Sequence, residues 1–359
     1  MNKRLILHAG MPKTGTTSIQ ETLGHSREKL LEQGIYYPSI RPFNHSFNFY
    51  LLFLDSPENN EMCKRQGIHD VHALKKAQEK FKSIWEDEFR KNSFKNFIIS
   101  AELLMVGTRK EIKTRIRRLK EFVAPYFDDI KVIVYVRSPV SFLNSITQQV
   151  LRHRSQPLDE MKFIKDWNLY KAQLTAYIDE FGKENIIVRP FDKAAFKNGD
   201  LISDFLHIID PDVRDEGIVR KKRNESLSYE ACVLLSEYNR RYPRYIKGEL
   251  NKDCGLASKP HIFINILSKI IDSRKFSLEF KFSRGEAERI NEEVEFINQF
   301  LPEDHQFEKV APSDEPMTFP TIDELSKEYL IDVINECNKK IEELSNRLEA
   351  LSGRQDDMS

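Results

Sequence analysis

The chain has 359 residues, of which 40% are hydrophobic and 31% are charged, and its formal net charge at pH 7 is zero. This length accommodates one large α/β domain with additions or two domains, and the hydrophobic content supports a substantial core. Because positive and negative charges balance, we expect no bulk attraction to nucleic acid, and any basic site must be local.

The cysteines and the N-terminal residues indicate in which cellular compartment the protein is expected. The chain has four cysteines, Cys63, Cys232, Cys254 and Cys337. They form no C-x-x-C pair and lack metal-ligand spacing, which indicates free thiols in a reducing compartment. The apolar run after Arg4 is too short for a signal peptide, and no run approaches the length of a membrane span. We therefore expect a cytoplasmic protein without a membrane span.

The beginning of the chain predicts a strand, a loop and a helix. Leu5–Leu7 is a short apolar run typical of a buried strand, and a turn containing Gly10 and Gly15 follows it. Ile19 and Leu23 then lie four residues apart, as on one face of a helix. This arrangement presents free backbone N–H groups to an anion at a helix N-terminus.

The loop is rich in groups that bind anions, because it adds a lysine and several hydroxyl donors to those N–H groups. The candidates are Lys13, Thr14, Gly15, Thr16, Thr17 and Ser18. Gly10 and Gly15 have the spacing of the nucleotide P-loop, G-x-x-x-x-G-K-[ST], but Thr16 stands where that motif has its lysine. A nucleotide triphosphatase would thereby lose the lysine that contacts its β- and γ-phosphates.

Apolar runs and helical spacings alternate along the rest of the chain. The predicted strands cover residues 34–38, 97–100, 131–136 and 185–191. The predicted helices cover residues 16–34, 71–91, 109–123, 139–148, a segment that ends at Gly182, and residues 200–209, 228–240, 261–272 and 283–301. This alternation favours a parallel sheet covered by helices.

Glu102 is the first candidate for a general base. It follows the predicted strand 97–100, and ligands of open α/β sheets gather at the C-terminal ends of strands. Partial desolvation there raises the pKa of a carboxylate toward neutrality, which suits proton abstraction. His45 is the rival, because an imidazole titrates near neutral pH without perturbation. It belongs to the aromatic segment 39–60, which is either part of the core or the wall of an acceptor channel.

Arg137 and Ser145 form a second candidate anion site. Arg137 follows the predicted strand 131–136, and Pro139 is well placed in the first turn of a helix. A helix that continues through Gln148 brings Arg137 and Ser145 near one anion.

These motifs resemble those of bacterial sulfotransferase-like proteins over residues 4–210. The run P-K-T-G-T-T at residues 12–17 is similar to the loop with which sulfotransferases bind the 5′-phosphosulfate of 3′-phosphoadenosine-5′-phosphosulfate (PAPS). An arginine at a strand end followed eight positions later by a serine, as at Arg137 and Ser145, resembles their site for the 3′-phosphate. Residues 34–38, 100–102 and 181–191 extend the resemblance.

The resemblance implies an α/β, P-loop-like three-layer fold with a parallel sheet of about five strands covered by helices and a mainly helical C-terminal part. It implies a PAPS-dependent enzyme that moves a sulfuryl group to a hydroxyl of a glycan or lipid-linked glycan, without a metal. Lys13 and Glu102, or Lys13 and His45, would carry the catalysis. The alternatives are an atypical P-loop ATP-dependent kinase and an inactive nucleotide-binding scaffold.

The resemblance is thin in the C-terminal part. The basic run Arg220–Arg223 is either a solvated loop or a segment that closes over the cofactor. A capping box at Ser283 and Glu286 opens one of the predicted helices. We expect a cofactor-binding core over residues 1–215, a helical part that completes the site over residues 216–310, and a C-terminal helix over residues 321–352.

That C-terminal helix carries a heptad seam of about three repeats. Its members are Leu330, Ile334, Cys337, Ile341, Leu344, Leu348 and Leu351. Ile334, Ile341 and Leu348 at one set of positions and mostly leucine at the other suit a two-stranded coiled coil. The seam predicts either a homodimer through residues 330–351 or a helix laid on its own domain.

Overall fold

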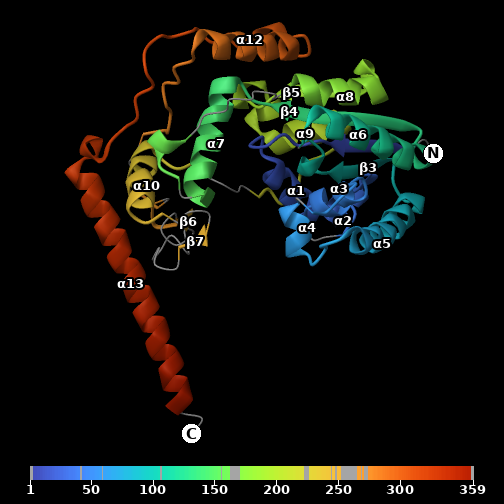
Figure 1. Ribbon diagram of the computed structural model, residues 1–359. Helices are drawn as coiled ribbons and strands as arrows, with labels where there is room; N and C mark the ends of the chain where they lie inside the picture. Colours follow the sequence, from blue (N-terminus) through green and yellow to red (C-terminus); the bar gives the residue numbers. More distant parts are fainter. Residues whose placement is uncertain are drawn as a thin grey trace. The chain divides into compact units, whose positions relative to one another are not determined.

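The computed structural model (Figure 1) describes the greater part of the chain. The described residues are 3–40, 43–58, 60–105, 107–154, 156–161, 170–221, 226–243, 245–246, 249–251, 265–267, 269–270 and 274–356.

A five-stranded, all-parallel sheet forms the centre of the N-terminal half, in the order β2-β3-β1-β4-β5. The strands are β1 (Arg4–His8), β2 (Ile35–Tyr36), β3 (Asn96–Ser100), β4 (Asp129–Val136) and β5 (Ile186–Pro190). In the central register, Leu7 lies opposite Ile99 on one side and Val132 on the other. The predictions of an α/β fold and of a parallel sheet of about five strands are confirmed.

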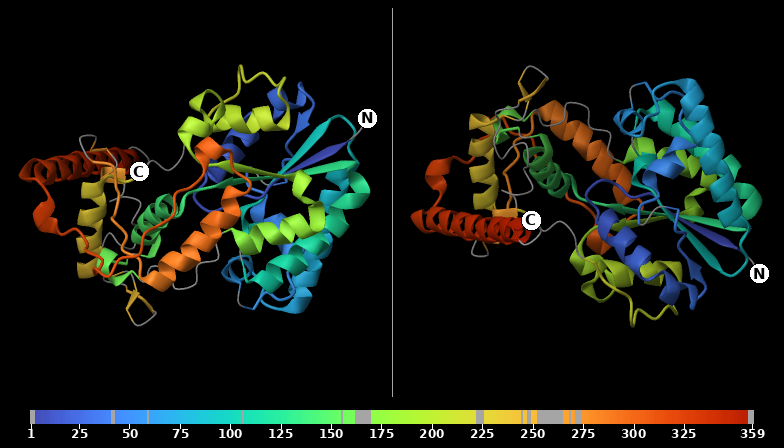
Figure 2. Two further views of the ribbon diagram at one scale, coloured as in Figure 1. Left: turned by 90° about the horizontal axis from the view of Figure 1, so that it is seen from above. Right: turned by 90° about the horizontal axis from the view of Figure 1, so that it is seen from below.

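Helices cover both faces of this sheet (Figure 2). On one face, Leu7, Ile99 and Val134 pack in a cluster with α5 (Val71–Arg90), α6 (Arg109–Val123), α8 (Lys171–Phe181) and the end of α12 (Arg284–Asn298). On the other face, Ile6 and Ile133 pack with α1 (Thr16–His25), α2 (Arg27–Leu31) and α9 (Leu201–Ile209). Strands buried on both faces explain the continuous apolar runs in the sequence.

Side-chain caps fix where several of these helices begin. Asp70 accepts a hydrogen bond from the N–H of Ala73 at the start of α5, and Thr108 and Glu111 form a capping box at the start of α6. Asp200 caps α9 in the same way. Each cap satisfies an N–H that the first helical turn leaves without a partner. The predicted helices 71–91, 109–123 and 200–209 are thus found within a residue of their expected bounds.

The helix expected over residues 16–34 is wrong in one respect, because the chain forms two helices there. Ser26 leaves the helical conformation between α1 and α2, and its backbone N–H bonds the carbonyls of Thr22 and Leu23. The Ser26 hydroxyl accepts the N–H of Val219, 193 residues away. A segment far along the chain therefore binds at the break between the two helices, and no local sequence pattern predicts such a contact.

The aromatic segment 39–60 contributes to the core in its described part. It forms α3 (Ser46–Leu51), and Phe47, Phe49 and Phe53 are buried. The short helix α4 (Glu61–Arg65) follows. Of the two interpretations of this segment, the core interpretation is the one that these side chains support.

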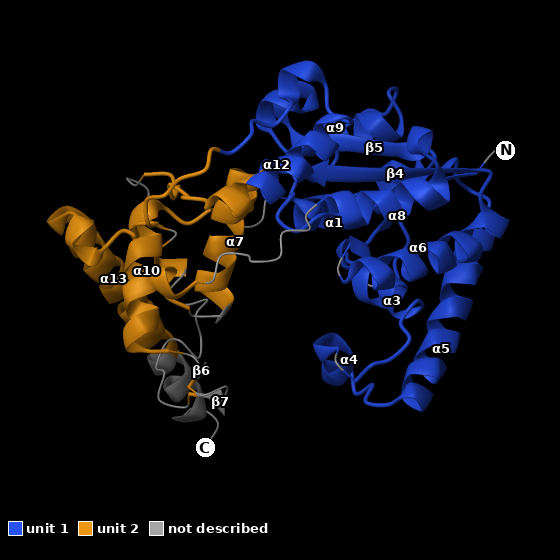
Figure 3. Ribbon diagram, turned by 45° about the horizontal axis from the view of Figure 1, so that its top comes forward, with its two compact units in different colours: residues 1–138, 166–223, 288–310 blue, residues 139–165, 224–287, 311–359 orange. Residues whose placement is uncertain are grey.

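Backbone contacts divide the chain into two compact units, each made of three segments (Figure 3). Unit 1 comprises residues 1–138, 166–223 and 288–310, and it contains the parallel sheet. Unit 2 comprises residues 139–165, 224–287 and 311–359.

Unit 2 is mainly helical in its described part. It contains α7 (Pro139–Arg154), α10 (Tyr229–Arg241) and α13 (Lys327–Asp356), with a short hairpin of β6 (Tyr245–Ile246) and β7 (Glu249–Leu250). Leu151, Ala231, Leu235 and Val333 belong to its core. The helix expected over residues 228–240 is found, whereas most of the one expected over 261–272 lies outside the described residues. No helix in the described part of the chain combines the length and the apolar character needed to cross a membrane.

Candidate functional site

The loop between β1 and α1 has an unusual backbone. Lys13 has a φ of 68° and Gly15 a φ of 74°, while Thr14 between them keeps a negative φ. In the described part of the chain, Lys13 shares a positive φ with only one other non-glycine residue, Asn198. When left-handed and right-handed backbone conformations alternate, successive N–H groups point toward one concave side, as in anion-binding nests. A lysine held in this sparsely populated region points to a functional constraint on the loop.

Close packing explains why glycines flank this loop. A Cβ atom on Gly10 would lie 2.3 Å from Oγ1 of Thr16, and one on Gly15 would lie 2.4 Å from a methyl group of Leu201. The side chains of Thr16, Leu201 and Phe191 would have to move to admit a Cβ atom, and the positive φ of Gly15 further favours glycine there. Thr14 is buried and its hydroxyl donates to the carbonyl of Met11 at 2.7 Å, which closes the turn.

The N-terminus of α1 completes the loop. The N–H of Ile19 bonds the carbonyl of Gly15 at 3.1 Å, and no side chain caps this end of the helix. The amides of Thr16 and Thr17 precede the first intrahelical hydrogen bond and lie at the positive end of the helix dipole. The Thr16 hydroxyl is buried and has no hydrogen-bond partner among the described residues. An anion with several oxygens fits such a set of donors.

Glu102 lies at the end of the strand next to β1. It begins the 3₁₀ turn η1 (Glu102–Met105), and its N–H donates to Oγ of Ser46 at 2.9 Å. Burial raises the pKa of its carboxyl group, and the positive charge of Lys13 opposes this rise. The two predicted catalytic residues Lys13 and Glu102 are thus close enough to interact electrostatically. A carboxylate with a raised pKa is suited to accept a proton.

Arg115 supports the turn that carries Glu102, and the sequence analysis missed it. Its Nη1 approaches the carbonyls of Leu103 and Leu104 at 3.4 and 3.3 Å, and its guanidinium lies 4.6 Å from the ring centre of Tyr50. Burial lowers the pKa of Arg115, which is only 4% exposed. A signal was present in the sequence: Arg115 lies on the apolar side of α6, beside Ile112 and Ile116.

His45, the other candidate base, is enclosed in the core. Its ring packs against Tyr37 and the edge of Trp85, with centroid distances of 4.3 and 5.3 Å. Nε2 bonds the carbonyl of Pro38 at 2.9 Å, and burial lowers the pKa of the imidazole to about 4. The neighbouring Ser46, rather than His45 itself, contacts Glu102.

Arg137 lies immediately after β4. Its guanidinium stacks 4.5 Å from the ring centre of Phe191, burial lowers its pKa, and its Nε has no hydrogen-bond partner in the described part of the chain. Tyr170 donates its hydroxyl to the Arg137 carbonyl. Ser145 is partly buried on α7, in unit 2, so its pairing with Arg137 on one anion stays a prediction.

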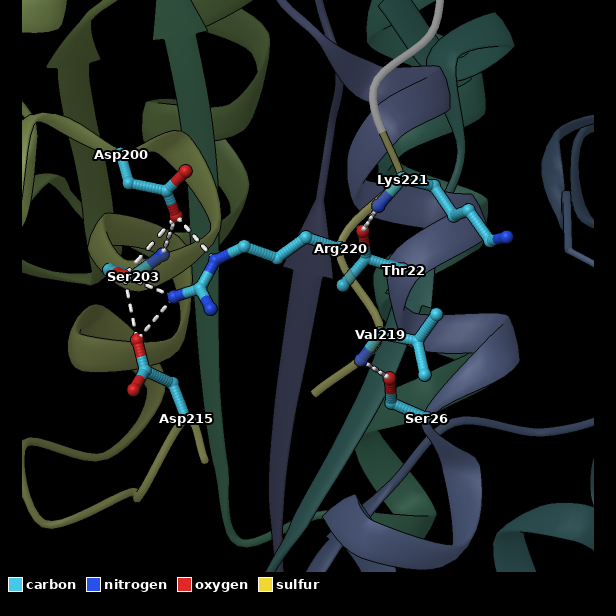
Figure 4. Close-up of polar contacts among 8 residues, drawn as sticks. All are labelled: Thr22, Ser26, Asp200, Ser203, Asp215, Val219, Arg220 and Lys221. Atoms are coloured by element: carbon cyan, nitrogen blue, oxygen red, sulfur yellow. Dashed lines mark hydrogen bonds and ion pairs between the residues drawn. The ribbon is translucent and has the colours of Figure 1, made fainter. Parts of the chain in front are cut away.

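The first half of the basic run 220–223 is fastened beside α1 (Figure 4). Arg220 forms ion pairs with Asp200 at 3.2 Å and with Asp215 at 2.5 Å, so two carboxylates within the chain balance its positive charge. The N–H of Lys221 donates to Oγ1 of Thr22 at 3.1 Å, while the side chain is exposed. Residues 222 and 223 lie outside the described residues, so closure over a cofactor stays a prediction.

Comparisons with known proteins do not identify a family. No protein-family model matches the chain, and no match is found among the curated proteins. Across the residues that the structure describes, no group of three or more His, Cys, Asp and Glu side chains is arranged to hold a metal ion.

Proposed function

We propose that this chain is a sulfotransferase with a P-loop-like fold, which moves a sulfuryl group from PAPS to a hydroxyl of a carbohydrate acceptor. The observation that carries the proposal is the loop at Lys13–Gly15, in which left-handed and right-handed conformations alternate. This loop leads into the N-terminus of α1, which no side chain caps, and Lys13 lies close enough to Glu102 to affect its pKa. The resemblance in the loop and at Arg137 and Ser145 supplies the identity of the donor.

The residues of the loop fit the phosphosulfate. The amides of Thr16 and Thr17, the unpartnered hydroxyl of Thr16 and the charge of Lys13 would hold its oxygens. When bound, PAPS would supply the sulfuryl group, and 3′-phosphoadenosine-5′-phosphate would leave through an oxygen of its 5′-phosphate. Fixed donors that face the phosphate stabilise the negative charge that grows there during transfer. The close packing of side chains against Gly10 and Gly15 would help to keep the reacting groups in position.

Glu102 is the residue that would accept the proton of the acceptor hydroxyl. Burial raises its pKa, which favours proton capture, and the nearby charge of Lys13 opposes part of that rise. His45 fits this role less well, because its buried imidazole already bonds Pro38 and its low pKa makes it a weak base.

Arg137 would take the 3′-phosphate, with Ser145 as its partner. A half-buried guanidinium whose Nε has no hydrogen-bond partner among the described residues would suit a charge-assisted contact with a phosphate. The carbohydrate nature of the acceptor and the cytoplasmic location rest on the resemblance and on composition alone.

Ligand-dependent thermal unfolding tests the proposal against both alternatives. We expect 3′-phosphoadenosine-5′-phosphate to raise the melting temperature without magnesium, because a ligand that binds only the folded state stabilises it by about 2.7 kcal/mol at 100 times its Kd. ATP with magnesium and buffer alone are the other two arms. A response only to ATP with magnesium would support a kinase.

Turnover separates an enzyme from a scaffold. Transfer of radiolabelled sulfate from PAPS to a mixture of glycans is expected for the native chain and not for Lys13→Met. Binding of the nucleotide together with a complete absence of transfer to every glycan, lipid-linked ones included, would favour the inactive scaffold.

A further inference from the structure

Helix α13 (Lys327–Asp356) presents two apolar sides within unit 2. Tyr329 and Val333 are buried in the core of that unit, and Leu330 and Cys337 pack against its edge. Cys337 is the last α13 residue that contacts this cluster among the described residues. A second group of side chains is exposed, with exposed fractions of 63% for Ile331, 59% for Ile334, 61% for Ile341 and 43% for Leu344. The first half of α13 is thus laid on its own unit, and an outward apolar stripe remains.

The stripe has the spacing of a coiled-coil seam. Ile334 and Ile341 are seven residues apart, and Cys337 and Leu344 follow each of them after three. Isoleucine at the first seam position with leucine at the second is the combination that favours two parallel strands.

From this stripe we propose that α13 pairs with α13 of a second copy of the chain, in a parallel and in-register coiled coil. A heptad seam is complementary to itself, because each knob fits a hole that the same seam provides on the other helix. This inference is independent of the proposed sulfotransferase activity, because it uses only residues of α13.

The charges that flank the seam decide the orientation. Lys340 and Arg347 occupy one flank, whereas Asn338 and Ser345 occupy the other. Antiparallel helices would set the two basic flanks against each other, whereas parallel helices set each basic flank against the neutral one. Glu343 of the same helix pairs with both basic residues, at 2.6 and 3.1 Å, but one carboxylate offsets only one of the two positive charges, so the flank stays net positive.

The polar side of α13 argues against a membrane as the occupant. Helices that lie on membranes carry lysine and arginine on their polar face, which attracts anionic lipids. Here the positions opposite the seam carry mostly acidic residues, at Asp332, Glu336, Glu342 and Glu343. An anionic surface would repel this face, whereas a second α13 covers the seam and leaves the carboxylates in water.

Light scattering of the full-length chain at micromolar concentration tests the pairing. We expect twice the mass of one chain, and a twofold fall in mass for Ile341→Glu and for Leu344→Glu. Both side chains are exposed in the single chain, so neither change should disturb folding. The matched control is Asn346→Glu, which adds the same charge outside the seam and should keep the dimer. A native chain with the mass of one copy, or a dimer that survives both seam changes, overturns the proposal.

An engineered cysteine at Leu344 tests the orientation. Leu344 is exposed in the single chain and lies in the seam, so in a parallel, in-register pair two copies of Leu344→Cys face each other and mild oxidation with copper phenanthroline should link the chains. Cys337→Ser is introduced alongside it, because Cys337 packs against its own unit. A dimer of this variant that does not cross-link overturns the parallel register. Binding to phosphatidylserine vesicles that is lost in Ile341→Glu would also overturn the proposal, because it would make a membrane the occupant.

Discussion

At the scale of single residues, the buried position that suits Glu102 to the proposed role of base also costs stability. Its carboxyl group is partly buried, and the positive charge of Lys13 offsets only part of the cost of this burial. Folding therefore raises its pKa above the value in the unfolded chain. The resulting contribution to stability is fully present below about pH 4.3, the ordinary pKa of a glutamate, and is lost as the pH rises through the folded pKa.

We expect Glu102→Gln to be more stable than the native chain at pH 7, because the variant does not bury an ionised carboxylate. The difference should disappear near pH 4, and urea unfolding between pH 4 and 8 measures it. Glu111→Gln is the control and should change stability in the opposite direction. A hydrogen bond from the Thr108 backbone N–H lowers the pKa of Glu111, so the ionised carboxylate stabilises the fold above the unfolded pKa, and the variant should be less stable than the native chain at pH 7. A loss of stability in Glu102→Gln at neutral pH would contradict the argument.

Arg137 carries a second prediction at this scale. Arg137→Ala should weaken the binding of 3′-phosphoadenosine-5′-phosphate by roughly 1.5–3 kcal/mol, the range for a hydrogen bond to a charged group. Isothermal titration calorimetry measures this loss. Adenosine 5′-phosphate, which lacks the 3′-phosphate, is the control ligand. An equal loss of affinity for both ligands would show that Arg137 does not bind the 3′-phosphate.

At the scale of elements, α6 supports the site through a single inward cation. Arg115 projects from the apolar side of α6 and binds the carbonyls of the turn η1, whose first residue is Glu102. The position of the candidate base therefore depends on a helix that precedes the next strand and contributes no residue to the anion loop.

We expect Arg115→Met to lower the free energy of unfolding by about 1.5–3 kcal/mol, because it leaves two partly buried carbonyls without their charged donor. Methionine keeps most of the volume of arginine, so lost packing contributes little. Arg117→Met is the matched control: Arg117 is exposed on the same helix and pairs with Glu180 at 3.5 Å, and such pairs contribute about 0–1 kcal/mol. Chemical denaturation compares the two variants. Similar losses in both would mean that Arg115 does not hold the turn.

At the scale of the whole molecule, periodicity in the sequence predicted the elements well and their long-range contacts poorly. The runs at Leu5–Leu7 and at 131–136 identified central strands, because a strand buried on both faces is apolar throughout. The break at Ser26 was not predicted, since it serves a contact with Val219, which lies 193 residues away. The pairing of Arg220 with Asp200 was not predicted either, since it depends on how the segment after α9 folds back.

The candidate site was also predictable only where local sequence patterns indicate it. Local spacing indicates the loop at Lys13, and a place at a strand end indicates Glu102. The sequence left the choice between Glu102 and His45 open, because burial distinguishes them and burial is a property of the assembled core. It also cannot show that residues 288–310 belong to the same compact unit as the sheet, after 64 residues of another unit at 224–287.

The central place of β1 has a consequence for how the chain acquires its structure. β1 pairs with β3 and β4, so Leu7 meets Ile99 and Val132, partners that are synthesised roughly a hundred residues later. Pairings so distant in sequence close slowly, because the entropy of a long loop is lost before the contacts form. During synthesis, the first strand must wait with its apolar side chains uncovered. We expect this interval to be when a nascent chain is most exposed to aggregation and most dependent on chaperones.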